Sequence, residues 1–400
     1  MIFSRPEFEV ADIITGYRDI PEKKGKLNAQ QKKVFTNLSN CRTQAMGHHI
    51  DKCDNPDCKH VHISYNSCRD RHCPKCNGAK REQWVKMRER DLLPVKYFHV
   101  VFTVPDTLNQ IFLAHQRLMY DLLFKSAWET IKKFGLDHKH LGAKTGMVAL
   151  LHTWGQNLAY HPHVHCIIPG GGITKNEKWR DTKNNGKFLF PVKALGKVFR
   201  GKFTDELIKL DEHGAICLQQ KFAPGKKYLH PLYKNKWVVY AKLPMCNAMQ
   251  VVNYIGRYSH RIAISNHRIK NVENGMVGFS YFNYRTSKDG TISLSAGDFL
   301  QRFALHILPP GYMKIRHYGI LSARNKAVAL DIARKALGAG DHNNRPGKSP
   351  KHVGVDGRGR ISYLCPVCKT GRMVVVETHR PKNKGSPYIK MLPNYDFCPQ

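Results

Sequence analysis

Hydrophobic and polar residues follow one another with periods that predict a mixture of strands and helices. The apolar run 97–104 (YFHVVFTV) is rich in β-branched and aromatic residues, which predicts a buried strand. A capping aspartate opens 106–135, where apolar side chains recur at helical spacing. Residues 146–156 and 163–169 predict two further strands joined by a short polar loop.

The pattern continues in the second half of the chain. Residues 236–243 predict a strand and 247–260 a helix. Four short strands are expected after them, over 261–265, 268–272, 276–285 and 291–294. The dipeptides Asn274-Gly275 and Asp289-Gly290 predict turns of the kind that join hairpin strands.

Helical patterns return toward the C-terminus. Ser295 can cap a helix that runs to Leu308, and a basic helix is expected over 322–337 before a linker rich in Gly, Asn and Lys. Irregular alternation of helices with antiparallel-type strands indicates an α+β fold. We expect three units: a helical, cysteine-rich unit over 1–95, the α+β unit over 96–337, and a basic linker and tail over 338–400.

The net charge of the chain indicates which class of macromolecule it binds. The 400 residues carry 65 Lys+Arg and 30 Asp+Glu, a net charge of +35, which favours a polyanionic partner such as nucleic acid. The 42% hydrophobic and 10% aromatic fractions exclude a chain that is disordered throughout. No apolar run approaches the ~18 residues of a membrane span, and we see no secretory signal. We therefore expect a cytoplasmic, nucleoid-associated protein with no membrane partner.

Six of the twelve cysteines lie between Cys41 and Cys76, which indicates metal binding rather than disulfides. Zinc takes four ligands in a tetrahedron, and two ligands on one tight knuckle can reach the same ion. The first expected structural site consists of Cys53, Cys58, Cys73 and Cys76. A second, less specific site would use Cys41, His49, Cys68 and His72. The alternative for the second set is a group of buried thiols with structural histidines.

The sequence HPHVH at 161–165 carries the most specific local signal in the β-rich part. Alternate residues of a strand face the same side, so His163 and His165 can both reach one ion. A third ligand should come from the neighbouring strand, either His152 or Gln156. Neutral ligands leave positions open for phosphate oxygens and water, as Lewis-acid catalysis requires. The alternative is a pair of packing histidines in a chain that contains 22 of them.

Two tyrosines lie four residues apart on the expected helix 247–260. Positions i and i+4 share a helix face, so Tyr254 and Tyr258 can point at the same site. A phenol with a pKa near ~10 needs a cation to act as a nucleophile at neutral pH, and Arg257 or Arg261 lies close by. Attack on a phosphodiester would give a 5′-phosphotyrosine and a free 3′-OH. The alternative is that both rings are packing residues.

With these elements in this order, the chain resembles the two-tyrosine HUH transposases of the IS91 type. The resemblance covers nearly the whole chain and rests on long motifs. These are 41–43 (CRT), 66–76 (NSCRDRHCPKC), 97–103 (YFHVVFT), 152–158 (HTWGQNL), 161–165 (HPHVH), 254–261 (YIGRYSHR), 263–266 (AISN) and 316–319 (RHYG).

The resemblance implies an HUH nuclease domain with a central antiparallel sheet and flanking helices, preceded by a small zinc-binding module. It implies rolling-circle-like transposition through single-stranded DNA, with Mg²⁺ or Mn²⁺ on His163 and His165 and with Tyr254 and Tyr258 as alternating nucleophiles. One or two structural Zn²⁺ ions, single-stranded or hairpin transposon ends, and a homo-oligomer fit the same picture. The arginines expected to contact DNA are Arg69, Arg71, Arg257 and Arg261.

Some features leave other interpretations open. Cys365 and Cys368 follow the linker like half of a zinc knuckle, with Cys398 near the end, and the alternatives are an incomplete site or a third zinc site. A plasmid replication initiator or relaxase would use the same chemistry. A non-enzymatic zinc-dependent DNA-binding protein would not nick DNA at all. A zinc hydrolase using His161, His163 and His165 lacks a nearby acidic base.

Overall fold

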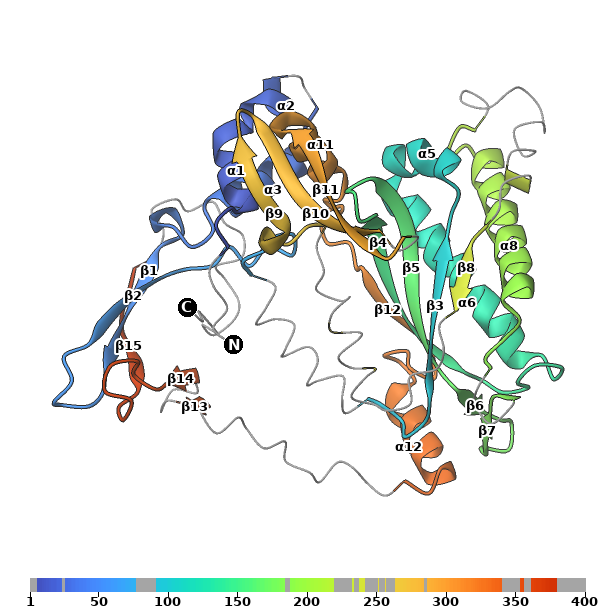
Figure 1. The fold of residues 1–400 in the computed structure, drawn as a ribbon. Coiled ribbons are helices and arrows are strands. Elements are labelled where there is room, and N and C mark those ends of the chain that lie inside the picture. The colour runs from blue at the N-terminus through green and yellow to red at the C-terminus, as the bar shows by residue number, and fades with distance from the viewer. Residues whose placement is uncertain are drawn as a thin grey trace.

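The computed structural model describes residues 6–23, 26–76, 91–183, 188–218, 232–233, 237–241, 251, 256, 263–283, 286–339, 353–355 and 361–379. In this part of the chain the strands form one sheet of five strands, two of three and two of two (Figure 1). The expected α+β class with a central antiparallel sheet is confirmed. No helix among the described residues is long and apolar enough to cross a membrane.

The five-stranded sheet has the order β12-β4-β5-β3-β8, and all its neighbouring strands are antiparallel. Its strands are β3 (Tyr97–Thr103), β4 (Gly146–Trp154), β5 (Tyr160–Pro169), β8 (Val239–Ala241) and β12 (Ile315–Gly319). The predicted strands 97–104, 146–156 and 163–169 correspond to β3, β4 and β5, and β8 lies within the predicted strand 236–243. Strand β12 has no counterpart among the strands predicted from the sequence. The three central strands, β4, β5 and β3, are largely buried, whereas β12 and β8 form the two edges of the sheet.

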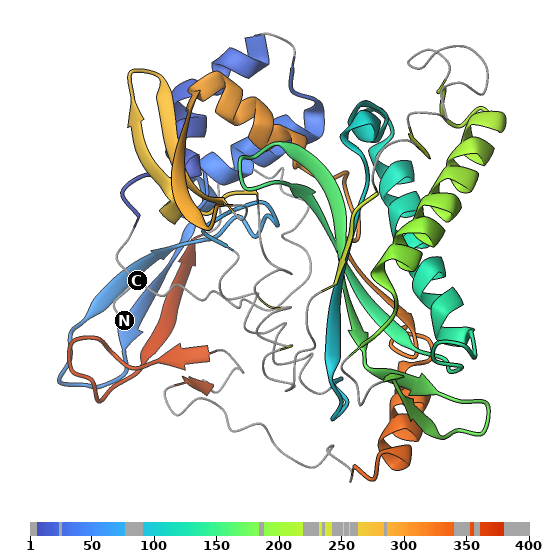
Figure 2. The ribbon, with the colours of Figure 1, turned by 45° about the vertical axis from the view of Figure 1, so that its right-hand side comes forward.

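Two long helices, α6 (Gln116–Leu136) and α8 (Val192–Glu212), cover one face of this sheet (Figures 1 and 2). Along β5 the side chains alternate, so Val164 and Cys166 enter the core beneath the helices. The histidines between and beside them consequently face the opposite side of the sheet. The hydrophobic core thus fixes which face presents the polar residues.

The long helix expected over 106–135 is interrupted. The chain forms a short turn of 3₁₀-helix, η2 (Asp106–Leu108), then α5 (Asn109–Ala114), and α6 begins only after His115. At His115 the backbone leaves the helical region, with φ −128° and ψ 48°. Apolar residues keep their helical spacing across this break, so their periodicity could not reveal it.

A second core joins the N-terminal helices to the three-stranded sheet β11-β10-β9. The phenyl rings of Phe35 and Phe303 lie 6.2 Å apart, and those of Phe279 and Phe299 lie 5.9 Å apart. The elements are α1 (Val10–Tyr17), α2 (Asp19–Lys23), α3 (Ala29–Ser39), β9 (Ile269–Glu273), β10 (Met276–Asn283), β11 (Lys288–Ser295) and α11 (Ala296–Leu305). The N-terminal helices α1, α2 and α3 and the distant segment from β9 to α11 therefore stabilise each other.

The turns of this sheet differ in part from expectation. Asn274 and Gly275 have φ 49° and 73° and connect β9 to β10, as expected. The expected turn at Asp289-Gly290 is wrong, because Gly290 pairs with Tyr281 inside β11. A Cβ on Gly290 would lie 2.7 Å from the Tyr281 ring, so this glycine makes room for an aromatic side chain. Residues 263–265 of the expected strand 261–265 are not a strand.

The third sheet, β15-β1-β2, combines the two ends of the chain. Its strands are β1 (His48–Cys53), β2 (Val61–Tyr65) and β15 (Met373–His379). The remaining elements are η1 (Gln44–Met46), β6 (Gly171–Ile173), β7 (Trp179–Asp181), η4 (Asn266–Arg268), α12 (Lys326–Ala336), β13 (Val353–Val355) and β14 (Ile361–Tyr363). Strand β1 is central, so the C-terminal strand β15 covers one of its two edges.

Candidate functional site

Three histidines converge on the face of the central sheet that the long helices leave uncovered. His152 on β4 pairs directly with His163 on β5, and His165 follows two residues later on the same face. The Nε2 atoms of His163 and His165 are 3.1 Å apart, and the ring centroids of His152 and His165 are 4.4 Å apart. One ring nitrogen from each residue lies within 4.8 Å of the others. This spacing fits ligands about 2.1 Å from one shared ion.

Hydrogen bonding orients the His163 ring for that purpose. Its Nδ1 lies 2.6 Å from the carbonyl oxygen of His161, so Nδ1–H donates and Nε2 keeps its lone pair. Burial lowers the pKa of His163 to about 4, which leaves the imidazole neutral near pH 7. A neutral imidazole with an available Nε2 is the form that binds a metal ion.

A fourth histidine, His99 on β3, contacts His165 of this group. Its Nε2 lies 2.9 Å from Nδ1 of His165, and the two rings are stacked with centroids 5.1 Å apart. With Nε2 of His165 turned toward an ion, its Nδ1–H donates to His99. Sequence reasoning missed this contact. The available signal was a histidine that interrupts an otherwise apolar strand.

The two candidates for the third metal ligand, His152 and Gln156, lie in different positions relative to strand β4. His152 belongs to the group of three. Gln156 lies in the turn that follows β4, beyond the irregularity in pairing between His152 and Trp154. Ligand binding by Gln156 stays a prediction.

The expected nucleophiles and their arginines lie outside the described residues. They are Tyr254, Tyr258, Arg257 and Arg261. Val251, which precedes them, is a buried helical residue packed with Leu150 and Ile167. Leu150 pairs with His165, so Val251 contacts the same sheet face as the histidines.

Four cysteines of the N-terminal segment form one cluster. The sulfur of Cys76 lies 3.4 Å from that of Cys41 and 3.6 Å from that of Cys68, and Cys73 completes the group. Disulfide sulfurs would be about 2.05 Å apart. Tetrahedral ligands at about 2.3 Å from zinc are roughly 3.8 Å apart, so these thiols fit a closed structural zinc site.

A second cluster contains Cys53, Cys58, Cys365 and Cys368. The sulfurs of Cys53 and Cys368 are 3.6 Å apart, and those of Cys58 and Cys365 are 3.7 Å apart. The expected grouping of Cys53 and Cys58 with the 73/76 knuckle is therefore corrected. The C-terminal pair is likewise not an isolated half-site. Spacing along the chain identifies a knuckle, but it cannot tell which two knuckles meet in space.

The two histidines expected as zinc ligands have other partners. His49 directs Nε2 toward the carboxylate of Asp51, 3.4 Å away. His72 lies between Asp70, 2.9 Å from Nδ1, and the backbone N–H of Leu308, which donates to Nε2 over 3.2 Å. Because Nε2 of His72 already accepts a hydrogen bond, this ring holds two chain segments together. The expected set with His49 and His72 is corrected to four cysteines.

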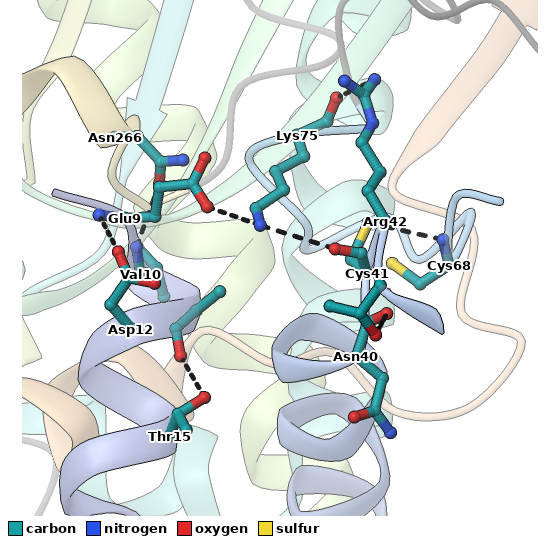
Figure 3. A network of polar contacts seen from close by, with 12 residues as sticks. Glu9, Val10, Asp12, Thr15, Asn40, Cys41, Arg42, Cys68, Lys75 and Asn266 are labelled. Carbon is teal, nitrogen blue, oxygen red and sulfur yellow. Dashed lines mark hydrogen bonds and ion pairs between the residues drawn. The ribbon is translucent and has the colours of Figure 1, made fainter. Parts of the chain in front are cut away.

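A polar network ties the first cysteine cluster to the N-terminal helices (Figure 3). Nζ of Lys75 lies 2.5 Å from the carboxylate of Glu9 at the start of α1, and it donates to the carbonyl oxygen of Cys41 over 3.5 Å. Arg42 donates to the carbonyl oxygen of Lys75, and the backbone N–H of Cys68 donates to the Cys41 sulfur. These contacts fix the knuckle against α1.

The arginines of the cysteine-rich segment differ in exposure. Arg69 is exposed, whereas the guanidinium of Arg71 donates to the carbonyl oxygen of Tyr312 and lines a hollow together with Lys314. Burial, together with the positive charge of Arg71, lowers the pKa of Lys314 to about 8. The two cations lie where the zinc module meets the central sheet. DNA contact by Arg69 and Arg71 stays a prediction.

Comparisons with known proteins agree with this architecture. Residues 146–328 match a family described as "Putative transposase", and residues 13–104 match the "Transposase zinc-binding domain". The chain is 39% identical over 382 residues to "Putative transposase y4qJ" of Sinorhizobium fredii, covering 92% of this chain and 95% of that protein. It is 28% identical over 340 residues to "Transposase for insertion sequence element IS801" of Pseudomonas savastanoi pv. phaseolicola, covering 82% and 78%. No solved structure matches the chain.

The cysteine clusters, the sheet and these matches together define a transposase with an N-terminal zinc-binding domain. The chain belongs to the IS91-type transposases. Its macromolecular partner is therefore DNA, and membership implies DNA endonuclease and strand-transfer activity in general. The cysteine clusters are the natural place for structural zinc.

Proposed function

We propose that this transposase nicks and rejoins single-stranded DNA through a 5′-phosphotyrosine intermediate, in rolling-circle-like transposition by HUH chemistry. The observation that carries the proposal is the group His152, His163 and His165 on the sheet face against which Val251 packs. These three imidazoles would hold Mg²⁺ or Mn²⁺. Such an ion, when bound, polarises the scissile phosphate and stabilises the charge that develops on it.

The tyrosines are the proposed nucleophiles. Tyr254 and Tyr258 follow Val251 by three and seven residues, a spacing that shares one face on the helix expected over 247–260. Val251 contacts the histidine face, so this spacing supports a location of both phenols near the histidines. Arg257 and Arg261 would favour the phenolate form by their positive charge.

One tyrosine oxygen attacks the phosphorus in line. A bond forms between that oxygen and the 5′-phosphate, the bond to the 3′-oxygen breaks, and the 3′-oxygen leaves as a hydroxyl after taking a proton. The second tyrosine cleaves the other end or the target in the same way. A freed 3′-OH then attacks the phosphotyrosine, which restores the phenol and completes strand transfer without ATP.

Binding of DNA ends is proposed for the basic surfaces and the zinc-binding module. A net charge of +35 predicts affinity that falls steeply with salt, because bound phosphates release counterions. Single-stranded or hairpin ends would leave bases available for stacking as well as phosphates for charge contacts. A plasmid initiator or relaxase would share this chemistry, but the relatives are named as transposases, which supports transposition.

The test is a labelled single-stranded oligonucleotide incubated with the full chain, with and without Mn²⁺, and run on a denaturing gel. Metal-dependent nicking with transfer of label to the protein is the expected result. A chain that binds the oligonucleotide without cutting it would instead be a zinc-dependent DNA-binding protein. Cleavage without a covalent protein–DNA product would indicate hydrolysis by water.

A further inference from the structure

The matched zinc-binding domain ends at residue 104, yet one of the two cysteine clusters takes half of its sulfurs from beyond residue 360. Cys365 and Cys368 are separated from Cys53 and Cys58 by about three quarters of the sequence. Nothing in the family match assigns these C-terminal cysteines to a site. Their meeting with the N-terminal pair therefore needs a physical account.

The C-terminal pair forms a preorganised knuckle. The backbone N–H of Gly371 donates to the sulfur of Cys368 over 3.3 Å, and the backbone N–H of Cys365 donates to the carbonyl oxygen of Gly371 over 2.8 Å. The backbone N–H of Lys369 donates to the carbonyl oxygen of Cys365 over 3.0 Å. These hydrogen bonds from backbone N–H groups form a tight turn, so both sulfurs point to one side. The hydrogen bond from Gly371 also stabilises Cys368 as a thiolate, the form of cysteine that binds zinc.

The two knuckles lie in close backbone contact. A Cβ on Gly371 would lie 2.4 Å from the Cys53 sulfur and 2.7 Å from the Cβ of Asn55, so no larger residue fits there. The backbone N–H of Asp54 donates to the carbonyl oxygen of Arg372 over 2.9 Å, and the N–H of Arg372 donates to the Asp54 carboxylate over 2.6 Å. Each knuckle therefore donates a hydrogen bond to the other, and the two are packed closely together.

Among the residues that the structure describes, apolar packing around this cluster is sparse. The buried residues of the local core are Cys53, Cys58, Cys365 and Met373. Against them pack only partly buried side chains, Tyr363 and Cys368. So small a core supplies little hydrophobic free energy, and natural domains of this kind depend on a metal ion for folding.

We propose that a second zinc ion, held by Cys53, Cys58, Cys365 and Cys368, fastens the C-terminal strand β15 to β1. The zinc-binding module of this transposase is then assembled from both ends of the chain. The inference concerns structural metal only and does not depend on the proposed DNA chemistry.

Such an ion would join two segments that are far apart in the sequence. Cys58 and Cys365 are 307 positions apart, and an ion that binds only the folded site stabilises the contact between these distant segments. Strand β15 pairs with β1 from His48 to Cys53. Loss of the ion would release β15 and expose that edge of β1, which invites aggregation.

Zinc counting by native mass spectrometry tests the proposal on the full chain. We expect two zinc ions in the wild type and one in the C365S/C368S variant. The C73S/C76S variant, which breaks the other cluster, should also retain one ion. The matched control Cys217→Ser changes an exposed cysteine outside both clusters and should retain two. A single ion in the wild type, or two in C365S/C368S, would overturn the proposal.

Cysteine reactivity tests the same site without any substitution. In the wild type, an alkylating reagent should modify exposed Cys217 first and leave Cys365 and Cys368 protected together with Cys53 and Cys58. A chelator should expose all four at one rate. Rapid alkylation of Cys365 and Cys368 before chelation would contradict the proposal.

Glycine substitutions distinguish an effect on the proposed zinc site from a general loss of stability. Gly371→Ala should lower zinc content by one ion and release hydrogen-exchange protection in β15. Gly201→Ala in α8, where no atom lies within 4 Å of the added carbon, should do neither. Two ions bound with wild-type protection in Gly371→Ala would overturn the assignment.

Discussion

His152 and His163 lie directly opposite each other on β4 and β5, with ring centroids 5.6 Å apart and ring planes at 84°. The register of this hairpin determines the composition of the site, because side chains alternate between the two faces. A shift of one residue would move His152 to the helix-covered face. The hydrophobic residues between the histidines hold the register and so place the third ligand.

Removal of a histidine from this group should abolish metal-dependent nicking. We expect His163→Ala and His165→Ala each to lower the rate beyond the ~10–100-fold that loss of a supporting partner produces. Nicking of a labelled oligonucleotide at increasing Mn²⁺ measures the effect. His161→Ala is the matched control, because its backbone carbonyl still accepts the bond from His163 and its own ring is 39% exposed. Wild-type nicking by His163→Ala would contradict the assignment.

His99 should act as a positioning residue through His165. Replacement by Phe removes the partner of His165 Nδ1, so we expect the Mn²⁺ concentration for half-maximal nicking to rise about 10–100-fold. His99→Gln keeps an acceptor and should restore part of the affinity. A purely structural role predicts lower thermal stability in both variants with an unchanged Mn²⁺ requirement.

The histidine strand was predictable from sequence because its signal is local. Alternation along β5 places Val164 in the core and His163 and His165 on the other face, which follows from strand geometry alone. The partner His99 escaped prediction because it lies 66 residues away in sequence, on β3. Which strands become neighbours depends on the whole sheet, not on either segment.

The cysteines show the same limit more sharply. The sequence marks the close pairs 53/58, 73/76 and 365/368, but the predicted grouping of pairs around ions is wrong. Cys53 and Cys58 join Cys365 and Cys368, and the 73/76 pair joins Cys41 and Cys68. At Asp289-Gly290, a strong turn signal instead reflects a glycine that accommodates the Tyr281 ring within β11. In both cases tertiary contacts override a local pattern.

The ion pair between Lys75 and Glu9 should stabilise the first zinc knuckle. Side-chain exposure is 15% for Lys75 and 10% for Glu9, so Lys75→Met leaves a largely buried carboxylate without its cation. We expect a loss of about 2 kcal/mol in the free energy of unfolding, less than for a fully buried pair. The double variant with Glu9→Gln should recover part of that loss in urea denaturation. Equal destabilisation of single and double variants would contradict this role.

His306 should make stability depend on pH. Burial lowers its pKa to about 4 from 6.5, and the ring is bonded to Thr153 and to the carbonyl oxygen of Leu158. Between pH 6.5 and 4 the unfolded chain binds a proton that the folded chain does not, so stability falls as pH falls. The contribution of His306 is about 3 kcal/mol over this window.

The matched variant is His306→Gln, which keeps a donor and an acceptor but does not titrate. Its free energy of unfolding, measured in urea from pH 7 to pH 4, should fall less steeply than that of the wild type. Parallel curves for the two proteins would show that His306 is not responsible. Zinc loss at acid pH affects both proteins alike and cancels in the difference.

The most direct test of the central claim is to map the covalent link between this chain and single-stranded DNA from a transposon end. With Mn²⁺ present, we expect mass spectrometry of the digested adduct to find DNA on Tyr254 or Tyr258. Tyr254→Phe and Tyr258→Phe should each block transposition, and the double variant should form no adduct. An adduct that persists in the double variant, or a wild-type chain that cuts DNA without one, would contradict the account.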